Sequence, residues 1–137
     1  MTTIFIDTNI VLNILLNRAF KAESLKILAL ATKEGYSLCI SALSYMNIHY
    51  QLKKKYTERE CRELIAKSKK HITTIDLHDL HIDKALISEF KDFEDAVQYN
   101  AALYAQADCI ITRNKKDFKK SVIKVLTPTE YLAQLSQ

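Results

Sequence analysis

The sequence predicts an α/β protein in which helices cover both faces of a parallel β-sheet. Short apolar runs typical of buried strands alternate along the chain with longer segments of helical periodicity. Strands that are joined by helices run parallel, and a parallel sheet buries both of its faces. The chain has one Gly and one Pro in 137 residues, too few turn residues for an all-β protein. We therefore expect a single α/β domain over residues 1–137.

Five apolar runs are expected to form the strands, at residues 3–6, 36–41, 71–77, 108–112 and 121–126. Helices are expected over residues 8–16, 21–33, 57–70, 79–90 and 92–105, with a last helix that begins at Thr127-Pro128. A further helix is expected to begin at Ser41 or Ser44 and to reach residues 53–55. Thr8 or Asn9 could cap the first helix, and Thr57 with Glu60 has the spacing of a capping box. Gly35 is placed to stop the second helix.

Composition limits the environment and the partners that we expect. The three cysteines (Cys39, Cys61 and Cys109) form no CxxC motif, which predicts reduced core thiols rather than disulfides or a zinc site. No basic, apolar leader is visible, and no apolar run approaches the roughly 18 residues needed to cross a bilayer. We expect a cytoplasmic protein without a membrane partner. A formal charge of +4 permits a polyanionic partner but does not require one.

Acidic residues are expected to gather at one edge of the sheet. Asp7 ends the first strand, where a charge is costly unless a partner compensates it. Asp92 and Asp95 open a helix on the same side of its first turn, and Asp117 follows the fourth strand. Ligands of parallel α/β sheets bind outside the carboxyl ends of the strands. Carboxylates at that edge would suit Mg²⁺ or Mn²⁺, and such a cation can orient a phosphodiester and activate water.

Each acid also has an ordinary structural explanation. Asp92 suits a helix N-cap, Asp95 suits the positive end of a helix dipole, and Asp117 could be a loop acid before an aromatic residue. Asp7 has the fewest such explanations. The hypothesis of a shared site therefore depends on the joint placement of the acids.

Other residues with reactive side chains fit a site less well. The four histidines (His49, His71, His78 and His81) share no ligand spacing with Cys, and we expect them to be polar surface residues. A single Gly excludes a P-loop or a GxGxxG motif. Asn9 stands where a phosphatase that forms an aspartyl-phosphate would carry a second Asp. The lysine clusters at 53–55 and 67–70 are typical of solvated helix faces, whereas the basic cluster at 113–120 flanks the acidic edge and is a candidate for phosphate contact.

The motifs FIDTNIVLN, ISALSYMNI, DFEDAVQYNAA and IITRNKKDF resemble the PIN-domain family, and within it the VapC-like toxin ribonucleases of toxin–antitoxin pairs. The resemblance covers nearly the full length of the chain. It implies a three-layer α/β/α sandwich with a central parallel sheet of about five strands. It also implies metal-dependent hydrolysis of RNA, a small antitoxin partner and, in many members, a homodimer.

The resemblance assigns roles to individual residues. The family acids match three catalytic and metal-binding residues, with an Asn as a further metal ligand: Asp7, Asp95, Asp117 and Asn114. Thr8 and Thr112 would support the site through hydroxyl hydrogen bonds. Three basic residues would hold the RNA backbone: Arg113, Lys115 and Lys116.

One position departs from the family pattern. Asn47 stands where the family usually has Glu, and Asn is neutral and shorter, so the site would lose a negative charge. Asp92 is the acid that we expect to compensate, because Glu94 would lie around the helix from Asp95. Two functions follow: a Mg²⁺- or Mn²⁺-dependent endoribonuclease, or a PIN-like module that binds RNA or protein without cleaving. A third is a structural dimer that binds no cation.

Overall fold

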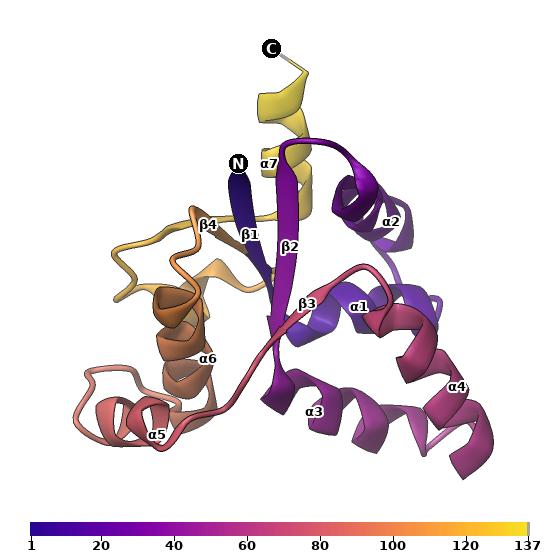
Figure 1. Cartoon of the computed structure of the whole chain (residues 1–137), viewed down its shortest axis with the longest axis horizontal. Helices are drawn as coiled ribbons and strands as arrows, with labels where there is room; N and C mark the ends of the chain where they lie inside the picture. Colours follow the sequence, from indigo (N-terminus) through magenta and orange to yellow (C-terminus); the bar gives the residue numbers. More distant parts are fainter. Residues whose placement is uncertain (137) are drawn as a thin grey trace.

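The computed structural model describes residues 1–136, and five parallel strands form its central sheet in the order β3-β2-β1-β4-β5 (Figure 1). The strands are β1 (Thr2–Ile6), β2 (Tyr36–Ser41), β3 (Thr73–Ile75), β4 (Cys109–Ile111) and β5 (Lys124–Leu126). The helices are α1 (Thr8–Leu15), α2 (Lys21–Ala29), α3 (Ala42–Leu52), α4 (Glu58–Lys69), α5 (Asp79–Leu86), α6 (Phe93–Tyr104) and α7 (Pro128–Leu135). Two 3₁₀ segments, η1 (Leu30–Thr32) and η2 (Lys115–Phe118), complete these elements.

The sheet buries side chains on both faces, as the apolar runs predict. Ile4 and Ile6 of β1 pack in the core beneath α1, α2, α3, α4 and α7. Phe5, between them in sequence, points to the opposite face and packs with Tyr99 of α6. The predicted three-layer α/β/α sandwich with five parallel strands is therefore confirmed. Within residues 1–136, no helix is long and apolar enough to cross a membrane.

The strand order creates a crevice above β1 and β4. From β1 the chain moves outward through β2 to β3, then crosses to β4 and β5 on the other side of β1. The connections after β1 and β4 consequently diverge to opposite faces of the sheet. This switch point is where ligands of open α/β sheets bind.

Several elements are shorter than predicted, among them β5, which begins at Lys124 rather than at residue 121. The segment 21–33 is helical as α2 only to Ala29, and one 3₁₀ turn follows before Gly35, whose φ of 90° suits a helix stop. Helix α5 ends at Leu86 rather than at residue 90, because the Ser88 hydroxyl donates to the carbonyl of Ala85 and turns the chain. Strand β3 is limited to the three residues that pair with β2.

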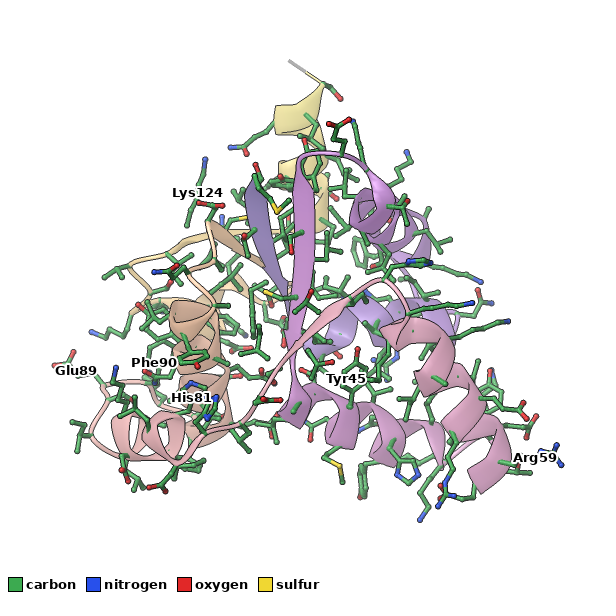
Figure 2. All side chains as sticks on the ribbon, in the orientation of Figure 1. Tyr45, Arg59, His81, Glu89, Phe90 and Lys124 are labelled. Atoms are coloured by element: carbon green, nitrogen blue, oxygen red, sulfur yellow. The ribbon has the colours of Figure 1, made fainter. Side chains whose placement is uncertain are left out.

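The surface assignment of His81 is wrong. Its side chain is buried between α5 and α6, where the ring packs edge-on against Tyr104 and accepts a hydrogen bond from the backbone N–H of His78 (Figure 2). Burial lowers the pKa of His81, so the fold favours its neutral form.

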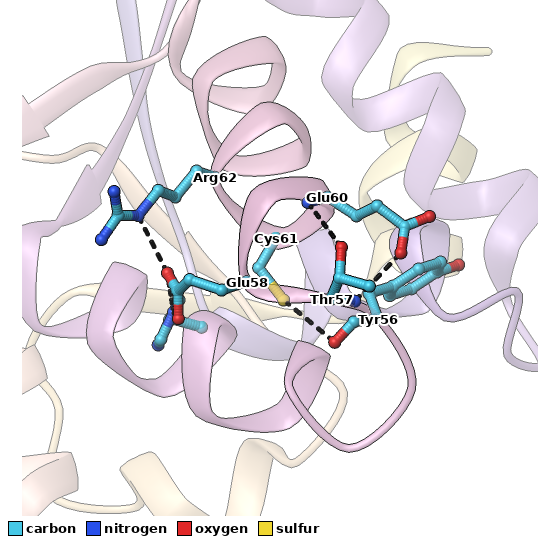
Figure 3. A network of polar contacts seen from close by, with 7 residues as sticks. Tyr56, Thr57, Glu58, Glu60, Cys61 and Arg62 are labelled. Carbon is cyan, nitrogen blue, oxygen red and sulfur yellow. Dashed lines mark hydrogen bonds and ion pairs between the residues drawn. The ribbon is translucent and has the colours of Figure 1, made fainter.

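The predictions for the cysteines and for the start of α4 are confirmed. All three cysteines are buried free thiols. Figure 3 shows Cys61 with its Sγ 3.9 Å from the carbonyl oxygen of Tyr56, beside the capping box that Thr57 and Glu60 form. The same view shows the ion pair of Arg62 with Glu58 on the exposed side of the helix.

Candidate active site

Asp7 lies at the switch point, where β1 ends and α1 begins. Its backbone N–H donates to the carbonyl of Ile111 at the end of β4, over 3.0 Å. Its carboxylate accepts one hydrogen bond from the Thr8 backbone N–H at 2.8 Å and another from the Thr112 hydroxyl at 2.9 Å. Asp7 therefore caps α1 itself, in place of Thr8 or Asn9, and it is fixed to both strands of the crevice.

An open pocket of about 320 Å³ lies over Asp7. Four acids line it from three separate segments: Asp7 between β1 and α1, Glu94 and Asp95 from α6, and Asp117 from η2. We call it the acid pocket, and its polar lining includes Asp7, Arg18, Asn47, Glu94, Asp95 and Asp117. The three acids that the sequence predicts to share a site are thus brought together.

The acids make one another harder to ionise. Burial raises the pKa of Asp7, and the charges of Asp117 and Glu94 raise it further against the hydrogen bonds from Thr112 and Thr8. Burial likewise raises the pKa of Asp95 to about 7, with the neighbouring carboxylates as added causes. A bound cation would relieve this repulsion, so the pocket is suited to positive charge.

Asp92 acts as a helix cap. One of its carboxylate oxygens accepts a hydrogen bond from the Asp95 backbone N–H at 2.9 Å, and Asp92 is the N-cap of α6. The prediction that Asp92 caps this helix is confirmed. The bond also fixes the first turn of α6, from which Glu94 and Asp95 extend.

Glu94, rather than Asp92, lies beside Asn47. The Asn47 amide donates to a Glu94 carboxylate oxygen at 2.6 Å, and both side chains line the acid pocket, whereas Asp92 does not. The expectation that Asp92 would compensate for the missing acid at position 47 stays a prediction, since Glu94 is the acid bonded to Asn47 while the charge of Asp92 acts on Asp95. Glu94 and Asp95 are adjacent on α6, yet the pocket is broad enough for both to reach it, because it opens between α3 and α6.

A buried polar network supports the floor of the acid pocket. Gln98 of α6 accepts a hydrogen bond from the Ser41 hydroxyl at 2.6 Å and donates to the Ser44 hydroxyl at 3.0 Å. The Ser44 hydroxyl also bonds the Thr8 hydroxyl at 2.8 Å. The network connects the starts of α1 and α3 to α6, so the elements that carry Asp7, Asn47 and Asp95 are tied together. Thr8 therefore uses its hydroxyl in this network and supports Asp7 through its backbone.

Comparisons with known proteins agree with this arrangement. A family model described as PIN domain matches residues 3–116. The chain belongs to the PIN domain family. No curated protein matches this PIN domain in sequence.

Solved structures similar to this PIN domain share its fold. VapBC2 from Rickettsia felis, bound to a promoter DNA fragment, matches with a TM-score of 0.70 and 15% identity over 92% of this chain and 98% of that one. A toxin–antitoxin complex from Klebsiella pneumoniae matches with a TM-score of 0.67 and 25% identity over 90% and 96%. VapC20 from Mycobacterium tuberculosis, a sarcin-ricin loop cleaving toxin, matches with a TM-score of 0.63 and 13% identity over 78% and 86%. The resemblance to VapC-like proteins is thereby confirmed at the level of the fold.

The loop after β4 of this PIN domain divides its polar residues among three places. Asn114 is absent from the lining of the acid pocket, and its backbone N–H donates to the Thr112 hydroxyl at 3.1 Å. Arg113 points away from the acids, because its guanidinium donates to Asn13 at 3.0 Å and lies over the Phe20 ring. Lys115 pairs with Glu130 at 3.2 Å. Of the three predicted RNA contacts, only Lys116 lies beside Asp95 and Asp117.

Sequence reasoning missed Arg18 as a residue of this site. It lies in the turn between α1 and α2, donates to Asn9 at 3.3 Å and brings a positive charge to the acid pocket. Its position in a short loop, outside every motif, gives no sequence signal of its own. The only sequence signal is Asn9, which directly follows Asp7 and Thr8. Its polar side chain at the end of the strand could have indicated a hydrogen-bond partner such as Arg18.

The donor set of the acid pocket fits a hydrated hard cation. Within residues 1–136, no group of three or more His, Cys, Asp or Glu side chains is arranged so that it could hold a metal ion. Mg²⁺ does not need such a group, since it binds through one or two carboxylates and keeps several waters. Asp7, Asp95, Asp117 and Glu94 supply only oxygen ligands, which are the kind that Mg²⁺ and Mn²⁺ prefer.

Proposed function

We propose that this PIN domain is a Mg²⁺- or Mn²⁺-dependent endoribonuclease that hydrolyses RNA phosphodiester bonds. The observation that carries the proposal is the convergence of Asp7, Asp95 and Asp117 in one open pocket at the switch point of the sheet. Burial raises the pKa values of Asp7 and Asp95, and the neighbouring carboxylates raise them further, so ionised acids at this position carry a cost to the fold. Crowding of this kind is typical of sites built for chemistry rather than for stability.

The residues of the acid pocket have separate tasks in this reaction. Asp7, Asp95 and Asp117 would hold the cation, and Glu94, oriented by Asn47, would supply a fourth carboxylate. The bound cation would polarise the phosphodiester and lower the pKa of the attacking water. Thr112 and the Thr8 backbone N–H keep both Asp7 oxygens in fixed positions through their hydrogen bonds. Arg18, which also lines the pocket, would contact the negative charge of the substrate.

The biological role that we propose is that of a toxin in a toxin–antitoxin pair, acting in the cytoplasm and held inactive by a small antitoxin protein. Three structural neighbours support this role, since two are VapBC or toxin–antitoxin complexes and VapC20 is a sarcin-ricin loop cleaving toxin. A homodimer is also expected, by the resemblance to the family.

A second function, an RNA- or protein-binding module without cleavage, is favoured by the neutral side chain at position 47. The Asn47–Glu94 hydrogen bond weakens this alternative, because a carboxylate stands beside the position that lacks one. The two functions differ in the effect of Asn47→Glu. A large gain in cleavage would mean that the natural site is impaired, whereas little gain would mean that Glu94 already fills the role.

The direct test is cleavage of single-stranded RNA by the purified chain in Mg²⁺, in Mn²⁺ and in EDTA. We expect cleavage in both metals and none in EDTA. Asp7→Asn should reduce the rate by about 100-fold or more, because it removes a charge aimed at the reacting centre.

Asp83→Asn is the matched control, since Asp83 is exposed on α5 and does not line the acid pocket. It removes the same charge and should cleave at the wild-type rate. Equal cleavage by wild type and Asp7→Asn would disprove the assignment, and so would cleavage that persists unchanged in EDTA.

A further inference from the structure

A second pocket adjoins the acid pocket and has different walls. It measures about 400 Å³ and shares Asp95 and Asp117 with the acid pocket. Its remaining walls include Phe90 and four lysines: Lys91, Lys116, Lys119 and Lys120. We call it the lysine pocket. Figure 2 shows Phe90 beside α6, close to Glu89 at the outer side of the molecule.

Three of these lysines are available for a ligand. Within residues 1–136, Lys91, Lys116 and Lys119 form no ion pair, and all three are exposed. Lys120 differs, because it lies 3.7 Å from Glu89, which also lines the pocket. Asp92, a further acid of this wall, already accepts the capping hydrogen bond of α6. The pocket is thus lined by four lysines and four acids, and three of the lysines remain without an ion pair among the described residues.

The other cationic residues of the loop after β4 are engaged elsewhere. Arg113 is bound to Asn13 and Phe20, and Lys115 is bound to Glu130. The basic residues of this region thus form two groups. Arg113 and Lys115 contact the segments around α1, α2 and α7, whereas the other lysines line the lysine pocket. Only the second group continues the acid pocket.

The wall formed by Phe90 suits a flat apolar group. One side of its ring stacks on Tyr99 with centroids 4.9 Å apart, and Phe118 meets it edge-on at 6.3 Å. These contacts hold the ring in one orientation while it still lines the pocket. An aromatic wall with lysines around it is the combination by which proteins bind single-stranded nucleic acid, with bases on the ring and phosphates on the cations.

From this geometry we propose that the lysine pocket is the subsite for the single-stranded RNA that flanks the scissile phosphate. The inference rests on the proposed function, because it places the scissile phosphate at Asp95 and Asp117. RNA that leaves the acid pocket past these two acids enters the lysine pocket. Lys91, Lys116 and Lys119 then contact phosphates, and Phe90 contacts a base.

The test measures RNA binding without cleavage, so it is independent of the metal chemistry. Fluorescence anisotropy is recorded in EDTA over a range of salt concentrations, with a labelled single-stranded RNA of about ten nucleotides. The triple variant Lys91→Gln, Lys116→Gln and Lys119→Gln should bind about tenfold or more weakly. The slope of log affinity against log salt should become shallower by about two, because three phosphate contacts are lost.

The matched control is the triple variant Lys67→Gln, Lys69→Gln and Lys70→Gln. These lysines are exposed at the end of α4, on the opposite face of the sheet from α6 (Figure 1), and their loss gives the same change in net charge. We expect the control to keep the wild-type salt slope. Phe90→Leu should weaken binding without changing the slope, since it removes a stacking contact and no charge.

Three outcomes would overturn the inference. They are no measurable binding by the wild type, equal losses in the two triple variants, and displacement of the RNA by polyglutamate at equal charge concentration. The last result would mark the pocket as a site for an acidic protein segment. The outcome for the proposed function is separate. If RNA binding depends on the lysines but no RNA is cleaved, only the proposed enzyme activity is contradicted. If the wild type cleaves RNA and the triple variant of the lysine pocket binds RNA as the wild type does, only the proposed subsite is contradicted.

Discussion

The acid pocket and the lysine pocket share Asp95 and Asp117 but are built in different ways. The acid pocket takes its residues from strand ends and first helical turns, and hydrogen bonds fix Asp7, Asn47 and the buried network beneath them. The lysine pocket takes its positive charge from exposed lysines of η2, of the residues that follow it and of the segment before α6. The difference indicates that precise positions are confined to the reacting centre, while the flanking surface needs only the correct charge.

The largest difference between the two pockets should appear in stability. Gln98→Leu removes both hydrogen bonds that this side chain makes and leaves the hydroxyls of Ser41 and Ser44 buried with fewer partners. We expect a loss of about 2–3 kcal/mol in the free energy of unfolding, measured by urea denaturation. Lys116→Ala in the lysine pocket should change it by less than about 0.5 kcal/mol. Equal effects would show that the network does not support the site.

The next effect concerns Glu94 and its charge. Glu94→Gln keeps an oxygen that can accept the Asn47 hydrogen bond but removes the negative charge. We expect an approximately tenfold loss of Mn²⁺ affinity, or about 1.4 kcal/mol, with little change in thermal stability. Glu89→Gln, which alters the lysine pocket instead, is the control and should bind Mn²⁺ like the wild type. Unchanged affinity in Glu94→Gln would remove Glu94 from the site.

A smaller effect should follow pH. Burial and the neighbouring carboxylates raise the pKa of Asp95 from 3.8 to about 7, so the folded state binds this proton more tightly than the unfolded state. The contribution of this bound proton to the free energy of unfolding is fully present below the ordinary pKa of an Asp carboxyl, 3.8. It is lost as the pH rises through about 7, the pKa of Asp95 in the folded state. In EDTA, Asp95→Asn should therefore be more stable than the wild type at about pH 8, by roughly 1 kcal/mol after allowing for solvent screening.

At about pH 5 the gain from Asp95→Asn should be smaller, because the wild-type carboxyl is then largely protonated when folded. Thermal melts at both pH values measure the difference. Lys119→Gln, in the lysine pocket, should show no such dependence on pH. A gain in Asp95→Asn that is equal at both values would contradict the raised pKa.

The smallest effect distinguishes two neighbouring lysines. Lys115 pairs with Glu130 on the surface, so Lys115→Gln should cost at most about 0.5 kcal/mol of stability and leave RNA affinity unchanged. Lys116→Gln should instead reduce the salt slope of RNA binding by about 0.7. Anisotropy titrations of the two single variants decide between them. An equal loss of RNA binding would show that the Glu130 pair opens when RNA binds.

Much of the fold follows from the sequence, and the reasons are local. The runs at residues 3–6 and 36–41 are apolar on both faces, and only a sheet covered on both sides accommodates them. The caps of Thr57, Asp92 and Thr127 mark helix starts because their partners lie three residues away. The end of α5 could not be predicted, because it depends on the single hydrogen bond that the Ser88 hydroxyl donates.

The sequence predicts the site residues that lie at the ends of strands. It does not predict those whose side-chain direction depends on contacts with another element. Asp7 follows from its place at a strand end, and the edge of the sheet determines its neighbours. The direction of Glu94 depends on the Asn47 amide on another helix, which local sequence does not reveal. The burial of His81 was missed for the same reason, since it results from the packing of α5 on α6.

The central claim is that Asp7, Asp95 and Asp117 form one cation site, and calorimetric titration with Mn²⁺ tests it most directly. The account predicts one binding event per chain in the wild type, weakened about tenfold or more by each of Asp7→Asn, Asp95→Asn and Asp117→Asn. Asp83→Asn should bind Mn²⁺ like the wild type. Wild-type affinity in all three acid-pocket variants would contradict the account.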